Sequence, residues 1–125
     1  MGTGELHYGV SLKLYFEDKA FGPGMSTLLR NIEKTGSLQG AAQAMNMAYS
    51  KAWKILKESE KAWGFALTAR ETGGRDGGGS TLTPQALELL AAYDAFMKEA
   101  GGELDRLFGI YFAPDWVEHL RNDWK

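Results

Sequence analysis

Polar and cationic side chains occur at close spacing between residues 48 and 61. After Ala48, which opens the stretch, they are Tyr49, Ser50, Lys51, Lys54, Lys57 and Lys61. Lysine and hydroxyl side chains at the start of a helix can bind base edges in the major groove of DNA, and lysines further along can bind phosphates. The chemistry that this stretch predicts is binding of double-stranded DNA. We assign the residues up to Lys54 to base contacts, and Lys57 and Lys61 to backbone contacts.

The distribution of charge along the chain supports this prediction more than the net charge of −2 does. Residues 30–75 hold eight basic and four acidic side chains, whereas residues 76–125 hold four basic and nine acidic ones. A basic segment of this kind fits a polyanionic partner. A row of lysines alone is also typical of a solvated helix face, so the elements around the row decide between the two interpretations.

Two further backbone contacts are expected outside this stretch. Arg75 lies in the glycine-rich run 72–79, between residues 65–71 and 80–83, which have the pattern of two strands. A hairpin there would offer Arg75 to a phosphate or to a minor-groove edge. The run is not a phosphate-binding loop, because Gly79 leads into a strand pattern and not into Lys-Ser or Lys-Thr and a helix, and a plain mobile turn remains open. Ser37 is expected to cap a helix and to contact the backbone.

Residues that could catalyse a reaction or bind a metal are few. The chain has no cysteine, and its histidines, His7 and His119, have no metal-binding spacing. Four acidic residues fit the exposed face of a helix: Asp94, Glu99, Glu103 and Asp105. We therefore expect no enzyme, no metal and no cofactor. Without an export signal or an apolar stretch of membrane length, a cytoplasmic protein with no membrane contact is expected.

The periodicity of apolar residues predicts the elements that position these side chains. Residues 10–17 alternate like a half-buried strand, and a first helix of about three turns ends at Gly36. A short second helix follows Ser37, and a break at Asn46-Met47 separates it from a third helix over residues 48–63. Two helices with so short a joint must cross steeply.

One side of the third helix is expected to face the core. At about 100° per residue, the apolar side chains on that side are Tyr49, Ala52, Trp53, Leu56 and Trp63. We expect Trp53 to be a core residue, and Tyr49 stays open between the core and a DNA contact. The lysines occupy the opposite side.

A fourth helix begins at Thr83-Pro84, where a hydroxyl cap precedes proline, and we expect it to end at Gly101-Gly102. Its apolar seam is broad enough for both a core and a second subunit, which predicts a homodimer. The dimerisation residues are Ala86, Leu89, Leu90, Tyr93, Phe96 and Met97.

The residues after this helix are too apolar for a disordered tail. Four of them can share one helical face and are expected to pack on the body or on the partner subunit: Trp116, Val117, Leu120 and Trp124. The predicted organisation is a flexible N-terminus (1–9), a winged helix-turn-helix domain (10–101) and an apolar extension (102–125). The fold class is mainly α with a small β hairpin.

Five short motifs in order resemble the N-terminal DNA-binding domain of the molybdate-responsive, ModE-type regulators, which are related to the LysR-type regulators. They are Thr35-Gly36-Ser37-Leu38, Ala41-Ala42, Met47 to Trp53, the glycine run around Arg75, and Leu82-Thr83-Pro84. A weaker similarity extends from about Val10 to Ala100.

The resemblance implies a dimeric transcription regulator that places the third helix in the major groove and the wing along the backbone. Family members that sense molybdate use C-terminal oxyanion-binding domains, and the 25 residues after Ala100 cannot form one. No molybdate-binding residue is therefore transferred to this chain. We expect a DNA-binding module whose effector, if it has one, is undefined. The alternative is a winged-helix module that binds another protein and binds DNA weakly or not at all.

Overall fold

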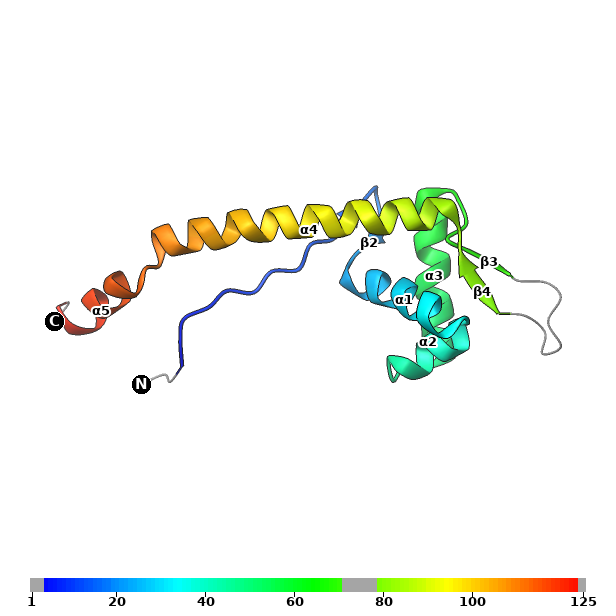
Figure 1. Ribbon diagram of the computed structural model, residues 1–125, viewed down its shortest axis with the longest axis horizontal. Helices are drawn as coiled ribbons and strands as arrows, with labels where there is room; N and C mark the ends of the chain where they lie inside the picture. The colour runs from blue at the N-terminus through cyan, green and yellow to red at the C-terminus, as the bar shows by residue number, and fades with distance from the viewer. Residues whose placement is uncertain (1–3, 71–78, 124–125) are drawn as a thin grey trace. The chain divides into compact units, whose positions relative to one another are not determined.

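The computed structural model describes residues 4–70 and 79–123. The chain divides into two compact units, one formed by Ser11–Ala92 and the other by the two ends of the chain, up to Val10 and from Tyr93 onward. The first unit carries the helices α1, α2 and α3 and two small hairpins (Figure 1). It is a winged helix-turn-helix, as the sequence predicts.

Three helices form the centre of the first unit: α1 (Pro23–Thr35), α2 (Leu38–Ala44) and α3 (Tyr49–Trp63). Both longer helices end at a glycine in the left-handed region, Gly36 with φ 81° and Gly64 with φ 84°. That conformation costs glycine little because it has no Cβ. The sequence-based ends of these helices are confirmed.

Local hydrogen bonds fix both ends of α2, including the joint to α3 at residues 45–48. Ser37 Oγ caps α2 by accepting a hydrogen bond from the Gly40 amide at 2.9 Å, so the predicted cap is confirmed. At the other end of α2, Asn46 has a φ of 52°, and the Met47 amide donates to the Ala42 carbonyl at 2.9 Å. The chain thereby reverses within a few residues, and α3 runs steeply across α2 (Figure 1).

The predicted wing is present as a hairpin of β3 (Thr68–Arg70) and β4 (Ser80–Leu82). The strands are antiparallel, and Ala69 lies opposite Thr81. The tip, including Arg75, lies outside the described residues. After the wing, Thr83 Oγ1 accepts a hydrogen bond from the Ala86 amide at 3.2 Å, which confirms the predicted cap of the fourth helix.

The strand expected over residues 10–17 is confirmed only at Leu14–Tyr15, and its predicted length is wrong. The structure has two short antiparallel strands instead, β1 (Leu14–Tyr15) and β2 (Lys19–Phe21). The Phe16 amide donates to the Asp18 carbonyl at 3.1 Å and closes a turn between them. The alternation of apolar residues misleads here because Val10 and Phe16 are each 60% exposed, whereas β2 buries Ala20 and Phe21.

The core of the first unit is built from apolar side chains of several elements. Its fully buried members include Phe21, Leu28, Leu29, Ile32, Ala41, Ala52 and Leu67. The small side chains of Ala41 and Ala42 allow α2 to lie close to α1. This core holds α3 and the strands of the wing in place.

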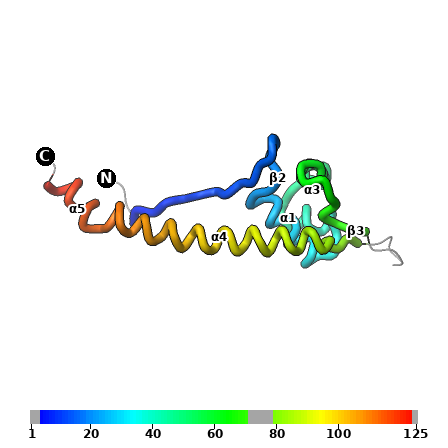
Figure 2. The backbone as a smooth tube through the Cα atoms, turned by 90° about the horizontal axis from the view of Figure 1, so that it is seen from above, coloured from blue at the N-terminus to red at the C-terminus, as the bar shows by residue number. Residues whose placement is uncertain are grey.

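The other unit contains most of α4 (Pro84–Tyr111), α5 (Pro114–Asn122) and the N-terminal segment. The Tyr8 hydroxyl donates to Asp105, and its ring centroid lies 5.1 Å from that of Phe108. The N-terminal segment thus runs beside α4 (Figure 2). The hydrogen bond to the Asp105 carboxylate raises the pKa of Tyr8, because that acceptor favours the protonated phenol.

The expected end of the fourth helix at Gly101-Gly102 is wrong, because α4 continues to Tyr111. Neither glycine adopts a positive φ, and each costs a helix only about 1 kcal/mol relative to alanine. Aromatic contacts continue past them, with ring centroids of Phe108 and Phe112 5.4 Å apart. No helix in the described part of the chain is both long and apolar enough to cross a membrane.

Candidate nucleic-acid interface

The start of α3 presents the side chains that the sequence assigns to base contacts. Ala48 is the N-cap residue, with φ −64° and ψ 140°, and the helix begins at Tyr49. All five assigned side chains are exposed: Ala48, Tyr49, Ser50, Lys51 and Lys54. The start of a helix also carries a partial positive charge from its backbone amides. This end of α3 therefore presents hydrogen-bond donors, cations and a positive dipole end to an anionic partner.

The opposite face of α3 is fixed to the rest of the first unit. Ala52 and Leu56 are buried in the core. Ser59 Oγ and Trp63 Nε1 both donate to the carbonyl of Ala20 in β2, the latter at 3.0 Å. These contacts hold the helix in a defined orientation, which a reading element requires.

The expectation that Trp53 is a core residue is wrong. Its side chain is 48% exposed, and Tyr49 is 52% exposed. The buried arc of α3 is centred on Ala52, Leu56 and Ser59, and at 100° per residue Trp53 lies about 90° from that centre. Ser59 belongs to this arc because its hydroxyl is buried, whereas a serine in a sequence is easily assigned to the surface. Both aromatic rings accordingly belong to the candidate interface.

Lys57 has partners within the chain. Its ammonium lies 3.2 Å from Glu60 Oε1 and 5.9 Å from the centre of the Trp53 ring. Glu60 Oε2 in turn accepts a hydrogen bond from the Leu67 amide at 2.7 Å. Lys57 is thus held between α3 side chains, whereas Lys61 is exposed with no ion pair within the described residues. Of the two lysines assigned to phosphates, Lys61 is the better placed.

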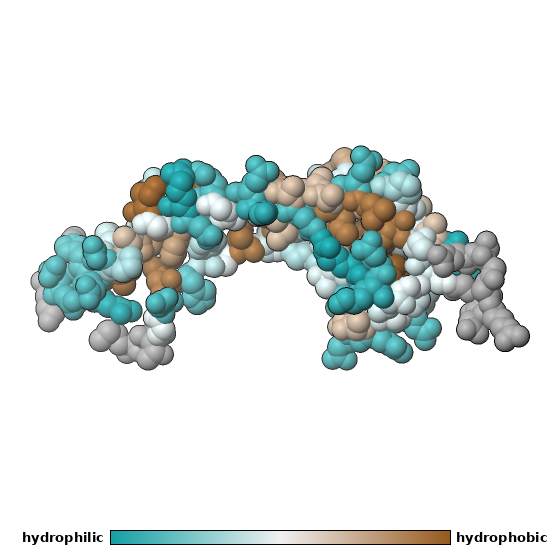
Figure 3. All heavy atoms as spheres, in the orientation of Figure 1, coloured by the Kyte–Doolittle hydropathy of each residue, from teal (hydrophilic) through white to brown (hydrophobic). Residues whose placement is uncertain are grey.

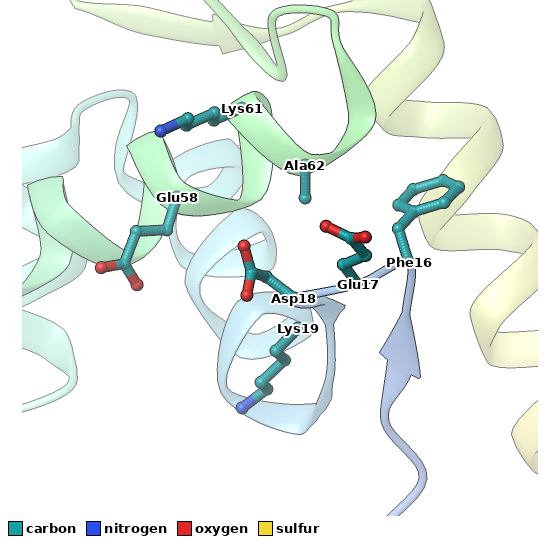
Figure 4. A pocket seen from close by; sticks show the side chains of 7 residues that line it. All are labelled: Phe16, Glu17, Asp18, Lys19, Glu58, Lys61 and Ala62. Atoms are coloured by element: carbon teal, nitrogen blue, oxygen red, sulfur yellow. The ribbon is translucent and has the colours of Figure 1, made fainter.

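An open hollow of about 620 Å³ lies where α3 faces the turn between β1 and β2. Its charged lining consists of Glu17, Asp18, Lys19, Glu58 and Lys61. Figure 4 shows Glu17 and Asp18 projecting from the turn toward α3. Three carboxylates and two ammonium groups line the hollow, so a phosphate that Lys61 contacts would have to lie outside it. The hollow therefore marks the end of the cationic surface of α3.

The other assigned residues are placed as follows. Ser37 is half-buried, and its hydroxyl oxygen is engaged in the cap of α2, which still leaves its proton as a donor. Of the dimerisation residues, Ala86, Leu90 and Tyr93 are buried within the single chain and Leu89 is half-buried. Burial raises the pKa of Tyr93. Phe96 and Met97 are 51% and 40% exposed, so they are the seam residues accessible to a partner.

No group of three or more His, Cys, Asp or Glu side chains is placed to hold a metal ion in residues 4–70 and 79–123. The arrangement instead combines a helix-turn-helix, a wing and an exposed cationic helix end. Residues 27–87 match the family of bacterial regulatory helix-turn-helix proteins of the lysR type. These residues form a LysR-type helix-turn-helix domain. The match includes α2, α3 and the wing strands.

Relatives that this domain matches include ModE proteins. The chain is 42% identical over 66 residues to the molybdenum transport protein ModE of Herbaspirillum seropedicae, covering 53% of this chain and 24% of that protein. It is 39% identical over 72 residues to the transcriptional regulator ModE of Haemophilus influenzae, covering 58% and 28%. It is 33% identical over 86 residues to the DNA-binding transcriptional dual regulator ModE of Escherichia coli K12, covering 68% and 33%. The aligned part thus spans only about a quarter to a third of each relative's length.

Proposed function

We propose that the chain is a sequence-specific regulator of transcription that binds double-stranded DNA in the cytoplasm and catalyses no reaction. The exposed, cationic start of α3 within a LysR-type domain carries the proposal. In this class of motif the second helix of the pair enters the major groove by its N-terminal end. Ser50, Lys51 and Lys54 then reach base edges together with Ala48 and Tyr49.

Contacts to the DNA backbone come from the flanks of this helix. Lys61 extends from the far end of α3 and Ser37 lies at the start of α2, and we add Arg75, which lies outside the described residues, on the sequence alone. Such contacts set the orientation of the protein on the duplex without reading sequence. We include Lys57 among them only in a reduced role, because Glu60 already neutralises it.

A salt titration tests this function. Binding of a mixed-sequence duplex to the full chain is expected to weaken by orders of magnitude between ~50 and ~200 mM salt, because each neutralised phosphate releases counterions. Fluorescence anisotropy gives the slope. The same titration with molybdate is the control, and we expect an unchanged Kd because no oxyanion site is assigned to these 125 residues. Absence of binding at low salt would contradict the proposal.

The proposed assembly is a homodimer that reads two half-sites about one helical turn apart. Phe96 and Met97 are the exposed residues of the α4 seam. Exchanging Phe96 for glutamate would place a charge in the apolar contact, and we expect a monomer that binds one half-site with reduced affinity. Sedimentation at tens of micromolar measures the change, with Leu87→Glu, which is exposed on α4 but lies off the seam, as the matched control. An unchanged dimer would exclude this seam.

A second candidate function is that of a winged-helix module that binds another protein. Its support is the exposed apolar surface of α4 and α5, which includes Ile110, Tyr111, Phe112, Trp116 and Leu120. Figure 3 shows hydrophobic surface gathered over the C-terminal end of α4. Val117 on the same segment is half-buried, and Trp124 lies outside the described residues. A chain that fails the salt titration would leave this function as the remaining one.

A further inference from the structure

Two aromatic rings stand exposed one turn apart near the start of α3. Tyr49 and Trp53 are 52% and 48% exposed. Residues four apart on a helix lie on the same side, with their Cβ atoms about 5–6 Å from each other. Tyr49 and Trp53 thus form one apolar edge, which we name the aromatic edge.

The packing of the first unit does not account for this exposure. Trp63, on the same helix, donates to Ala20 and contacts the rings of Phe16 and Phe65 at 5.1 and 5.8 Å. Within residues 4–70 and 79–123, the cation beside Trp53 is Lys57, whose ammonium lies 5.9 Å from the ring centre. Tyr and Trp are enriched at surfaces that bind a partner, because each combines a large apolar ring with a polar group.

The aromatic edge lies next to the residues assigned to base contacts. Trp53 directly precedes Lys54, and Tyr49 directly precedes Ser50. Four residues of helix advance only about 6 Å along the axis, which is short beside a major groove about 12 Å wide. A helix inserted far enough for Ser50 and Lys54 to reach bases therefore brings the Trp53 ring to the groove as well.

The chemistry of the ring selects what it can contact there. An indole face offers apolar surface, and the C5-methyl group of thymine is the apolar feature of the major groove. Other base edges present hydrogen-bond donors and acceptors, which would lose water against the ring without compensation. The complement of the aromatic edge is therefore a thymine methyl.

A series of polar contacts supports the orientation of the Trp53 ring. The Lys57 ammonium lies over the ring, Glu60 Oε1 lies 3.2 Å from that ammonium, and Glu60 Oε2 accepts from the Leu67 amide at 2.7 Å. The last contact in this series is made by the backbone amide of Leu67, directly before β3. Lys57 and Glu60 thereby act as positioning residues for the ring.

We propose that Trp53, held by Lys57, is a specificity-determining residue that recognises the C5-methyl group of a thymine in the major groove. This inference rests on the proposed DNA-binding function and names a feature that its sites must contain. It also gives two lysines of α3 different roles, since Lys57 positions the ring whereas Lys61 contacts phosphates.

The test removes single methyl groups from the DNA. A duplex selected from a random pool by the full-length chain is remade with deoxyuridine in place of one thymine at a time, which deletes the methyl and leaves the hydrogen-bonding edges intact. We expect at least one position to weaken binding about 3- to 10-fold, as burial of one methyl group implies. The ratio to compare is the affinity for the thymine duplex divided by the affinity for the deoxyuridine duplex at that position. For Trp53→Ala this ratio should fall to about one, and for Trp53→Phe it should stay between one and the value of the unaltered chain.

Three comparisons decide the outcome. The ratio does not depend on the fraction of active protein, so a variant that folds poorly still reports on the methyl. Lys61→Ala should keep the full ratio while losing overall affinity, and Lys57→Met should lower the ratio with less change in salt dependence than Lys61→Ala. A thymine preference that survives in Trp53→Ala, or a site with no such preference, would overturn the inference. Failure of the unaltered chain to bind any duplex would instead refute the proposed function.

Discussion

Replacing Gly79 by alanine is expected to lower the stability of the first unit more than replacing any other glycine whose surroundings are described. A Cβ at this position would lie 2.2 Å from the backbone oxygen of Gly36. The oxygen belongs to the C-cap of α1 and accepts a hydrogen bond from the Ser80 amide at 2.7 Å. The Gly36 oxygen and the Ser80 amide both belong to the backbone, so neither can move away as the end of a flexible side chain could.

The cause is close approach rather than backbone strain. The φ of Gly79 lies outside the left-handed region, so alanine meets no torsional barrier there. Relief of the overlap requires β4 to move away from α1, which breaks the hydrogen bond that joins the base of the wing to the helix. Overpacking of this kind costs about 1–3 kcal/mol in the free energy of unfolding.

Urea unfolding followed by circular dichroism measures this cost. Gly101→Ala is the matched control, because Gly101 lies within α4 and a Cβ there meets nothing within 4 Å. Alanine should stabilise α4 by ~0.5–1 kcal/mol, since it loses less conformational freedom in a helix than glycine does. Equal unfolding midpoints for Gly79→Ala and the unaltered chain would show that the wing does not depend on this contact.

Local rules were sufficient to predict much of the fold. The caps formed by Ser37 and Thr83 are confirmed by their hydrogen bonds to the amides of Gly40 and Ala86. The left-handed ends at Gly36 and Gly64 follow from the freedom of glycine alone. These signals depend on a few neighbouring residues, so they are readable without knowledge of the tertiary contacts.

Tertiary contacts explain what could not be predicted. The face of α3 that is buried depends on the Ala20 carbonyl, which lies far away in the sequence and binds Ser59 and Trp63. Without knowledge of that contact, the helical period of the apolar residues predicts Trp53 in the core. Likewise α4 continues through Gly101-Gly102 and brings Phe108 against Tyr8, a contact between residues far apart in the sequence.

The candidate site likewise has features that the sequence predicts and features that depend on tertiary contacts. The exposure of Ser50, Lys51 and Lys54 follows from the helical period of the sequence. The pairing of Lys57 with Glu60 depends on the Leu67 amide, which holds the Glu60 carboxylate in place. A count of lysines alone therefore overstates the charge available to phosphates.

Lys51 and Lys61 are expected to contribute to DNA binding in different ways, and their loss should separate sequence reading from charge. Lys51 lies in the first turn of α3, where an inserted helix meets base edges, whereas Lys61 lies in its last turn, where the helix leaves the groove. Lys51→Ala should cost ~1–3 kcal/mol on the preferred site and much less on random duplex. Lys61→Ala should weaken both similarly and reduce the salt slope by about one.

The measurement is the affinity of each variant for a selected and a random duplex at one salt concentration, followed by a salt titration. Lys57→Ala is the internal control, since its partner Glu60 already compensates its charge and its loss should change the slope by less than that of Lys61. Arg75→Ala should resemble Lys61→Ala, unless the wing enters a narrow minor groove, where A·T-rich flanks would lose more affinity. Equal losses on both duplexes for Lys51→Ala would move the reading residues away from the start of α3, because a side chain that contacts only phosphates cannot distinguish the two sequences.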